Sequence, residues 1–368
     1  MKQNWTYKKI GEVCEVKTGR LDANASDEGG MYPFFTCSKE PLRINTFSYD
    51  TECILVAGNG DLNVKYYNGK FDAYQRTYII TLKQDISDVS IKYLFCFFSL
   101  YVETLRKKSI GGVIKYIKLG DITEAKVPLP PLSTQSRIVS ELDLLQSLID
   151  KQKAQLKEYD TLAQSIFYDM FGDPVENEKG WDVKKLGDVC AKITDGTHKT
   201  PNYQDSGIVF ISAKNIKNGY FDYSDCKYVS EAEFDELDKR CNPRYGDVVI
   251  TKSGSIGDCA ILDAKFPVAF FESLALVKLK DVVNAIFFKF FFRNQSVHNK
   301  YIKGKAKGIA IKHLHLIDLK SVDVILPPLS LQQTFAAKIE SIEKQKAAIS
   351  KSIAETEKLF EYTMDKYF

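Results

Sequence analysis

The sequence contains one heptapeptide twice, as Leu129-Pro-Pro-Leu-Ser-Thr-Gln135 and, 197 positions later, as Leu326-Pro-Pro-Leu-Ser-Leu-Gln332. A second motif, W-x-x-K-K-[IL]-G-x-V-C, begins at Trp5 and again at Trp181, 176 positions apart. Repetition at fixed offsets indicates a duplicated structural unit. Because the offsets of 197 and 176 differ by 21, the second copy carries 21 extra residues inside its globular part.

Each copy of the heptapeptide predicts the start of a long helix. Ser133 and Ser330 stand where a helix N-cap is expected, and Gln333 completes a capping box in the second copy. The first helix is expected to end at Phe171-Gly172-Asp173-Pro174, since glycine suits a left-handed C′ position and proline cannot continue a helix. Helices of about 39 residues would each be roughly 58 Å long.

Apolar residues recur with alternating spacings of four and three along both predicted helices, in the same register at an offset of 197. Core-packed helices average only about 11 residues, so this pattern favours two helices packed as a coiled coil. One polar position interrupts each predicted seam, which suggests a fixed register unless that side chain faces solvent. The polar positions are Gln152 and Lys346, and the seam consists of Ile138, Leu142, Leu145, Ile149, Leu156, Phe335, Ile339, Ile342, Ile349 and Ile353.

The segments between the repeated motifs are typical of short strands, each set followed by one apolar helix. Strands are expected at 53–57 and 76–82 in the first copy and at 246–251 and 274–279 in the second. Helices are expected near 91–106 and 284–300. The predicted class is α+β, with two mixed α/β globular domains and two long helices.

Composition limits the function classes. With 368 residues, of which 44% are hydrophobic, the chain is long enough for two globular domains. We expect a soluble cytoplasmic protein, because no apolar run fits a secretory signal or a membrane span. The eight cysteines are scattered without a C-x-x-C motif and are expected to be reduced. A net charge of only +3 means that nucleic-acid contacts would depend on local basic patches.

No motif in the sequence supports catalysis. Asn242-Pro-Arg-Tyr245 differs from the N-P-P-Y run of amino-methyltransferases at Arg244, and Gly58-Asn-Gly60 does not lead into a cofactor-binding helix. His313 and His315 have no nearby third ligand, so we expect no metal site. A phosphate-binding G-x-x-x-x-G-K-[ST] motif is also absent.

Local clusters of basic and polar residues are candidate DNA contacts. Two clusters surround a glycine turn that follows the apolar helix of each copy, where backbone amides and lysines can approach a phosphate. Three further loops carry side chains suited to reading base edges. A solvated loop is the simpler alternative for each. The candidates are Lys17, Arg20, Lys107, Lys108, Lys115, His198, Lys199, Lys252, Ser253, Ser255, Lys305, Lys307 and Lys312.

Together these features resemble the specificity subunit of Type I restriction-modification systems. The resemblance covers the whole chain as module, helix, module, helix, and includes Ile193-Thr-Asp-Gly-Thr-His198 and Gly207-Ile-Val-Phe-Ile-Ser212. It implies target-recognition domains at 1–132 and 173–329, and spacer helices at 133–172 and 330–368 that form an antiparallel coiled coil. Each recognition domain would read one half of a bipartite, asymmetric DNA site.

The resemblance also implies partners: double-stranded DNA, two methyltransferase subunits and restriction (translocase) subunits. It implies that this chain is non-catalytic and binds no cofactor. S-adenosylmethionine, and ATP with Mg for restriction, would be bound by partner subunits. Two alternatives stay open at this point, a coiled-coil adaptor without DNA contact and a self-sufficient methyltransferase.

Overall fold

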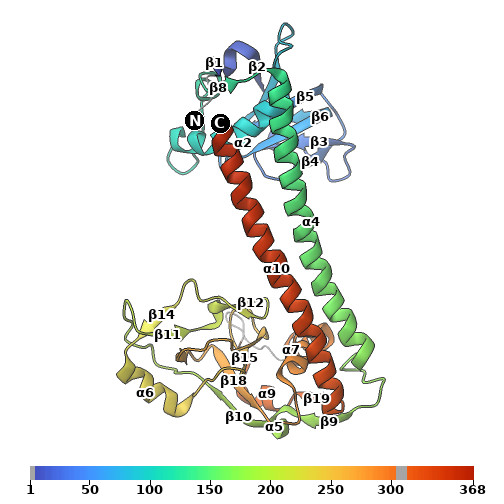
Figure 1. Cartoon of the computed structure of the whole chain (residues 1–368), viewed down its shortest axis with the longest axis vertical. Helices are drawn as coiled ribbons and strands as arrows, with labels where there is room; N and C mark the ends of the chain where they lie inside the picture. The colour runs from blue at the N-terminus through green and yellow to red at the C-terminus, as the bar shows by residue number, and fades with distance from the viewer. Residues whose placement is uncertain (1–4, 304–312) are drawn as a thin grey trace. The chain divides into compact units, whose positions relative to one another are not determined.

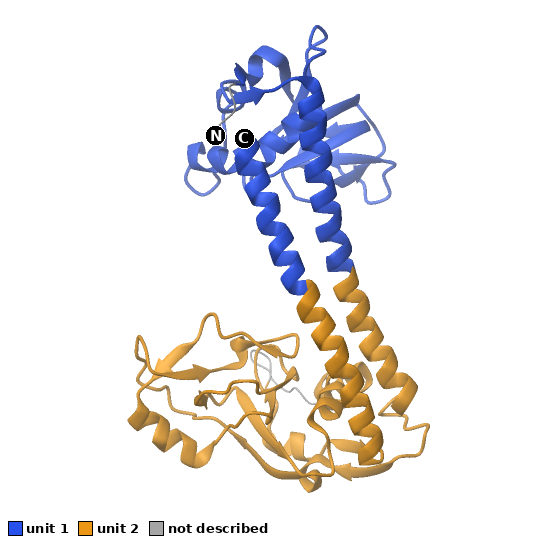
Figure 2. Ribbon diagram, viewed as in Figure 1, with its two compact units in different colours: residues 1–154, 350–368 blue, residues 155–349 orange. Residues whose placement is uncertain are grey.

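The computed structural model describes residues 5–303 and 313–368, and the chain divides into two compact units (Figure 2). Unit 1 comprises residues 1–154 and 350–368, and unit 2 comprises residues 155–349. The two long helices are α4 (Leu132–Phe171) and α10 (Leu329–Tyr367). Each unit therefore contains the first part of one long helix and the last part of the other.

Unit 1 is built on a six-stranded sheet with the order β2-β7-β5-β6-β3-β4. Figure 1 labels β2, β3, β4, β5 and β6 of this sheet. All neighbours in this sheet are antiparallel except β3 and β6. Helix α2 (Ile91–Lys108) packs on β5 and β6, and its buried residues include Tyr93, Leu94, Phe97 and Phe98. The other elements are β1 (Thr6–Lys9), α1 (Ile10–Val13), β2 (Cys14–Thr18), β3 (Tyr32–Phe35), β4 (Leu42–Ile44), β5 (Tyr49–Ala57), β6 (Val64–Ala73), β7 (Thr77–Leu82), α3 (Leu119–Thr123) and β8 (Lys126–Leu129), which pairs with β1.

Unit 2 repeats this order of strands in two smaller sheets. The sheet β10-β18-β15-β16 corresponds to β2-β7-β5-β6, and β14-β11-β17 corresponds to β4, β3 and the last part of β6. The strands are β9 (Asp182–Lys185), β10 (Cys190–Asp195), β11 (Ile208–Ile211), β14 (Lys227–Val229), β15 (Val248–Thr251), β16 (Cys259–Ile261), β17 (Val268–Phe270), β18 (Leu274–Leu279) and β19 (Asp323–Leu326), which pairs with β9. The helices are α5 (Leu186–Val189), α7 (Ala285–Arg293), α8 (Gln295–Val297) and α9 (Leu316–Lys320).

Unit 2 also has elements without a counterpart in unit 1. A short hairpin, β12 (Ile216–Lys217) and β13 (Tyr220–Phe221), follows β11, and helix α6 (Glu231–Arg240) follows β14. The single strand β6 is replaced by the separate strands β16 and β17. The extra residues of the second copy thus lie in the middle of its globular part, as the two sequence offsets indicated.

The core of each unit includes residues from both long helices. In unit 1, Ile138 and Leu142 of α4 join Met364 and Tyr367 of α10 in one buried cluster. In unit 2 the corresponding cluster contains Phe167 and Phe171 of α4 together with Phe335 and Ile339 of α10. The helices are therefore integral parts of both globular cores.

The glutamine that ends the repeated heptapeptide makes equivalent hydrogen bonds in both copies. Gln135 is fully buried, accepts a hydrogen bond from the Ser90 amide (2.8 Å) and donates to the Asp88 and Pro130 carbonyls (both 2.9 Å). Gln332 is equally buried, accepts from the Asn284 amide (2.9 Å) and donates to the carbonyls of Val282 and Pro327. Ser90 and Asn284 are the N-caps of α2 and α7. Each glutamine thus joins a long helix to the apolar helix of the same unit.

Two local predictions were wrong. Ser133 and Ser330 are not N-caps, because the carbonyls of Pro131 and Pro328 already accept the first helical hydrogen bonds, from Gln135 and Gln332. The single helix expected over 284–300 is interrupted at Asn294, whose extended backbone ends α7 and whose side chain accepts from the Ser296 amide to start α8.

The predicted end of the first long helix is confirmed, with Phe171 as its last residue and Gly172 at φ +75°. Strands β5, β7, β15 and β18 lie where the sequence predicted them. Within the described ranges 5–303 and 313–368, no helix has both the length and the apolar character needed to cross a bilayer.

Candidate nucleic-acid interface

Two of the predicted polar loops lie at equivalent places in the two units. Strand β2 leads into Gly19 and strand β10 into Gly196, and a Cβ at either glycine would lie about 2 Å from a backbone carbonyl oxygen, of Ala73 or of Phe270. Only glycine allows this close approach. The chain leaving each glycine is fixed by backbone hydrogen bonds from Arg20 to Ala73 (3.1 Å) and from Thr197 to Phe270 (3.0 Å). The fold therefore presents a loop at the same strand end in both units.

The loop of unit 2 is organised around a buried carboxylate. Asp195, the last residue of β10, is 4% exposed. Its Oδ2 accepts from Lys252 Nζ (2.5 Å) and lies 3.2 Å from His198 Nε2, while its Oδ1 accepts from Arg240 (2.6 Å). The last residue of α6 and residues that follow β10 and β15 thus meet at one side chain.

The charge of Asp195 is stabilised by these partners. Burial raises the pKa of Asp195, but the hydrogen bond and charge of Lys252, followed by those of His198, outweigh burial and lower it below the ordinary value. Lys252 is only 6% exposed. The Lys252 ammonium therefore stabilises the loop from the protein interior. Because it is buried, Lys252 is not among the proposed direct DNA contacts.

Basic side chains around Asp195 reach solvent. The side chains of His198 and Arg240 are each more than half exposed, and Lys199 is exposed next to them. Unit 1 presents a different set at the equivalent loop, where Arg20 is exposed and Lys17 forms an exposed ion pair with Glu15 (2.9 Å). The two units thus share a scaffold but offer different chemistry.

The second predicted cluster of unit 1 forms a projecting loop. Lys107 and Lys108 end α2, and Lys108 Nζ donates to the Tyr101 hydroxyl (3.0 Å). The loop turns at Gly111, where φ is +124°, and Lys115 is exposed beyond the turn. Its tip is the fully exposed Val113. The lysines therefore flank an exposed apolar residue in this loop.

The remaining predicted DNA contacts are two serines in one turn and three lysines. Ser253 is half-buried and Ser255 exposed in the turn between β15 and β16. Lys305, Lys307 and Lys312 lie outside the described residues. Arg240 was missed by sequence reasoning, because it is 45 residues from Asp195 and no local motif signals their contact. In the described part of the chain, no group of three His, Cys, Asp or Glu side chains could hold a metal ion.

None of the residues predicted to form the seam of the long helices is exposed. Those in unit 1, Ile138, Leu142, Leu145, Ile149 and Ile353, are buried or half-buried. The same is true of those in unit 2, which are Leu156, Phe335, Ile339, Ile342 and Ile349.

The family described as Type I restriction modification DNA specificity domain matches the chain over residues 2–158 and 178–358. The chain belongs to this family. Its match to the type I restriction enzyme EcoDI specificity subunit of Escherichia coli is 40% identical over 157 residues, covering 42% of this chain and 34% of that protein. The MjaIX specificity subunit of Methanocaldococcus jannaschii is 21% identical, with 92% of this chain and 87% of that protein covered.

Solved structures show the same fold. The S subunit of a Type I restriction-modification system from M. genitalium superposes with a TM-score of 0.63 at 16% identity, covering 99% of this chain and 96% of the other. A chain from a study of complex assembly and conformational transition in the type I restriction-modification system gives a TM-score of 0.57 at 19% identity, covering 99% and 97%. Both solved chains thus share the fold of this chain despite low sequence identity.

Proposed function

We propose that this chain is the non-catalytic DNA-recognition subunit of a Type I restriction-modification complex. The observation that carries the proposal is the pair of loops after Gly19 and Gly196, which occupy equivalent places but present different polar side chains. Two similar modules with different loops suit the two halves of a bipartite, asymmetric DNA site. Direct contacts to DNA are assigned to Lys17, Arg20, Lys107, Lys108, Lys115, His198, Lys199, Ser253, Ser255, Lys305, Lys307 and Lys312, with Arg240 added.

The proposal assigns target recognition to residues 1–132 and 173–329, and an antiparallel coiled coil to residues 133–172 and 330–368. Contacts inside each unit support the coiled coil. In unit 1, Gln152 donates to Ser352 (2.8 Å) and Lys153 pairs with Glu357 (2.8 Å). In unit 2, Lys346 pairs with Asp160 (2.7 Å). The polar seam residues Gln152 and Lys346 therefore bond across the helix pair, which favours a role in fixing its register.

Two methyltransferase subunits are the proposed partners, together with restriction (translocase) subunits. Exposed apolar side chains recur at equivalent positions of the two copies, although most other surface residues differ. Leu162 and Leu359 are 46% and 51% exposed and 197 positions apart, and each lies in a different unit. The same holds for Leu132 and Leu329. A repeated apolar surface suits two copies of one partner. In this proposal S-adenosylmethionine, and ATP with Mg, bind to the partners.

Genome-wide mapping of methylated motifs, with and without this gene, tests the proposed function. We expect one bipartite motif to lose methylation in the deletion strain and to regain it on complementation. An unchanged set of methylated motifs would contradict DNA recognition and would favour an adaptor role instead.

A further inference from the structure

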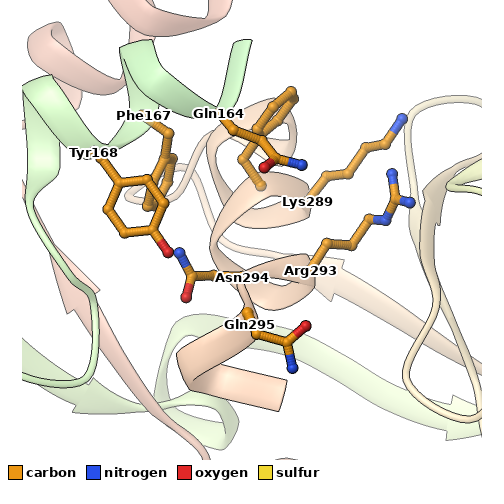
Figure 3. Close-up of a pocket in the computed structure, with 8 residues that line it drawn as sticks. Gln164, Phe167, Tyr168, Lys289, Arg293, Asn294 and Gln295 are labelled. Atoms are coloured by element: carbon orange, nitrogen blue, oxygen red, sulfur yellow. The ribbon is translucent and has the colours of Figure 1, made fainter. Parts of the chain in front are cut away.

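Helix α7 of unit 2 carries two cations that line a small cavity. Lys289 and Arg293 lie one helical turn apart and extend in the same direction, with the amides of Gln164 and Gln295 to either side (Figure 3). The cavity has a volume of about 190 Å³, and its lining also includes Asn294, Phe167 and Tyr168 but no carboxylate. Its polar side chains are therefore two cations, three amides and the hydroxyl of Tyr168.

Lys289 forms no ion pair within the described residues, although the charge of Glu343 acts on it at longer range. Within the described residues no carboxylate lies within ion-pair distance of its ammonium, which instead sits 4.1 Å from the centre of the Tyr220 ring. Residues 1–4 and 304–312 contain no Asp or Glu in their sequence. The nearby Glu343 is already bonded to the Tyr220 hydroxyl (2.9 Å) and to Lys346 (3.1 Å).

The positions of Lys289 and Arg293 are energetically unfavourable when no anion is bound. Lys289 is half-buried, and burial, followed by the charge of Arg293, lowers its pKa. Like charges four residues apart on a helix also destabilise that helix. A bound anion would relieve both costs.

The cation pair is a feature of unit 2 alone. The contacts of Gln135 with Ser90 and of Gln332 with Asn284 place the starts of α2 and α7 at equivalent positions, 194 residues apart. The buried phenylalanines of α7 then match the buried face of α2, while Lys289 corresponds to Phe95 and Arg293 to Ser99. The shared fold therefore does not require either cation.

The elements around Arg293 are also specific to unit 2. Asp258 Oδ1 lies 3.2 Å from the Nε of Arg293, while Asp258 Oδ2 accepts from the Gly219 amide (3.2 Å) in the β12–β13 turn. A Cβ on Gly219 would lie 2.3 Å from the Arg293 guanidinium, so glycine at φ +80° lets the hairpin pack directly on this side chain. The β12–β13 hairpin therefore packs against the cation pair of Lys289 and Arg293. The described part of unit 1 has no counterpart of either feature.

We propose that Lys289 and Arg293 bind one backbone phosphate of the DNA target, in a site that unit 1 does not have. The inference rests on the proposed function. Two cations flanked by amides, in a cavity without a carboxylate in its lining, are suited to an oxyanion. The same two cations also border a hollow lined by Asp160 and Glu343, and both of these carboxylates pair with Lys346. Small-molecule sites usually exceed about 300 Å³, so a cavity of about 190 Å³ suits a single phosphate group better than a whole nucleotide.

Lys289→Met tests the proposal in the assembled complex with its methyltransferase subunits, on a duplex that contains the mapped motif. The plot of log affinity against log salt should become shallower by about 0.9, the contribution of one phosphate contact. A series of duplexes, each with one neutral methylphosphonate, should show one position at which the neutral linkage weakens wild-type binding more than Lys289→Met binding, in which Arg293 alone would contact that phosphate. The methylated motif should stay the same.

Lys92→Met is the matched control, since Lys92 is an exposed lysine on α2 that also lies over a tyrosine ring. Without DNA, the thermal midpoint of Lys289→Met should equal or exceed that of wild type, because a half-buried cation has been removed. An unchanged salt slope, or an equal change in both variants, would overturn the phosphate site. Absence of sequence-specific binding by the wild-type complex would instead contradict the proposed function.

Discussion

Asp195 shows how a single side chain can hold a loop in shape. Its carboxylate binds the buried Lys252 and the more exposed His198 and Arg240. Asp195→Asn should destabilise unit 2 by about 3 kcal/mol, because Lys252 would keep a buried charge without a counter-ion. Denaturant unfolding would measure the loss, with the exposed Asp205→Asn as a control for the same chemical change. Equal stability of the two variants would contradict this role of Asp195.

The lowered pKa of Asp195 also predicts how stability depends on pH. A carboxyl group whose pKa is lower in the folded protein stabilises the fold above its unfolded-state pKa, near 3.9, and this stabilisation is lost as the pH falls through the folded-state value. Wild type should therefore lose stability more steeply than Asp195→Asn below about pH 4. Unfolding measured from pH 7 to pH 2 would show the two curves converging, and parallel curves would count against the assignment.

At the level of elements, Gln135 and Gln332 join each long helix to an apolar helix. Gln135→Ala should destabilise unit 1 by about 2 kcal/mol, since the Ser90 amide and two carbonyls would lose a buried partner. Gln332→Ala should have the same effect on unit 2. Hydrogen exchange should quicken at the start of α2 in the first variant and of α7 in the second. The exposed neighbour Gln333 provides the control, as Gln333→Ala should alter neither helix.

The elements that could be predicted from the sequence are those defined by local patterns. Five heptads and Gly172 mark α4, and continuous apolar runs mark β5, β7, β15 and β18. Short strands such as β4 and β14 lack such runs, and the break at Asn294 depends on a side-chain cap inside an apolar segment. In the candidate site, the loops were found from their glycines and charges. The contact of Asp195 with Arg240 was not, because tertiary folding alone brings them together.

For the whole molecule, the repeated exposed leucines predict how many partners assemble. Leu162→Asp and Leu359→Asp should each remove one methyltransferase subunit from the complex, and the double variant should remove both. Native mass spectrometry would count the subunits. Leu144→Asp is the control, because Leu144 is also exposed but its counterpart 197 residues later is Ser341. Retention of both subunits by the double variant would rule out this surface.

The core of unit 1 combines residues from the beginning and the end of this sequence, which the ribosome makes at different times. Met364 and Tyr367 pack with Ile10 and Ile138 in one cluster, and about 200 residues of unit 2 are translated between them. At a ribosomal rate of about 5–20 residues per second, the first module would wait roughly 10–40 s for the helix segment that completes its core. Unit 2 is continuous in sequence and has no such delay. The module made first is thus the one finished last, and in the interval its unfinished apolar surface is open to chaperones and proteases.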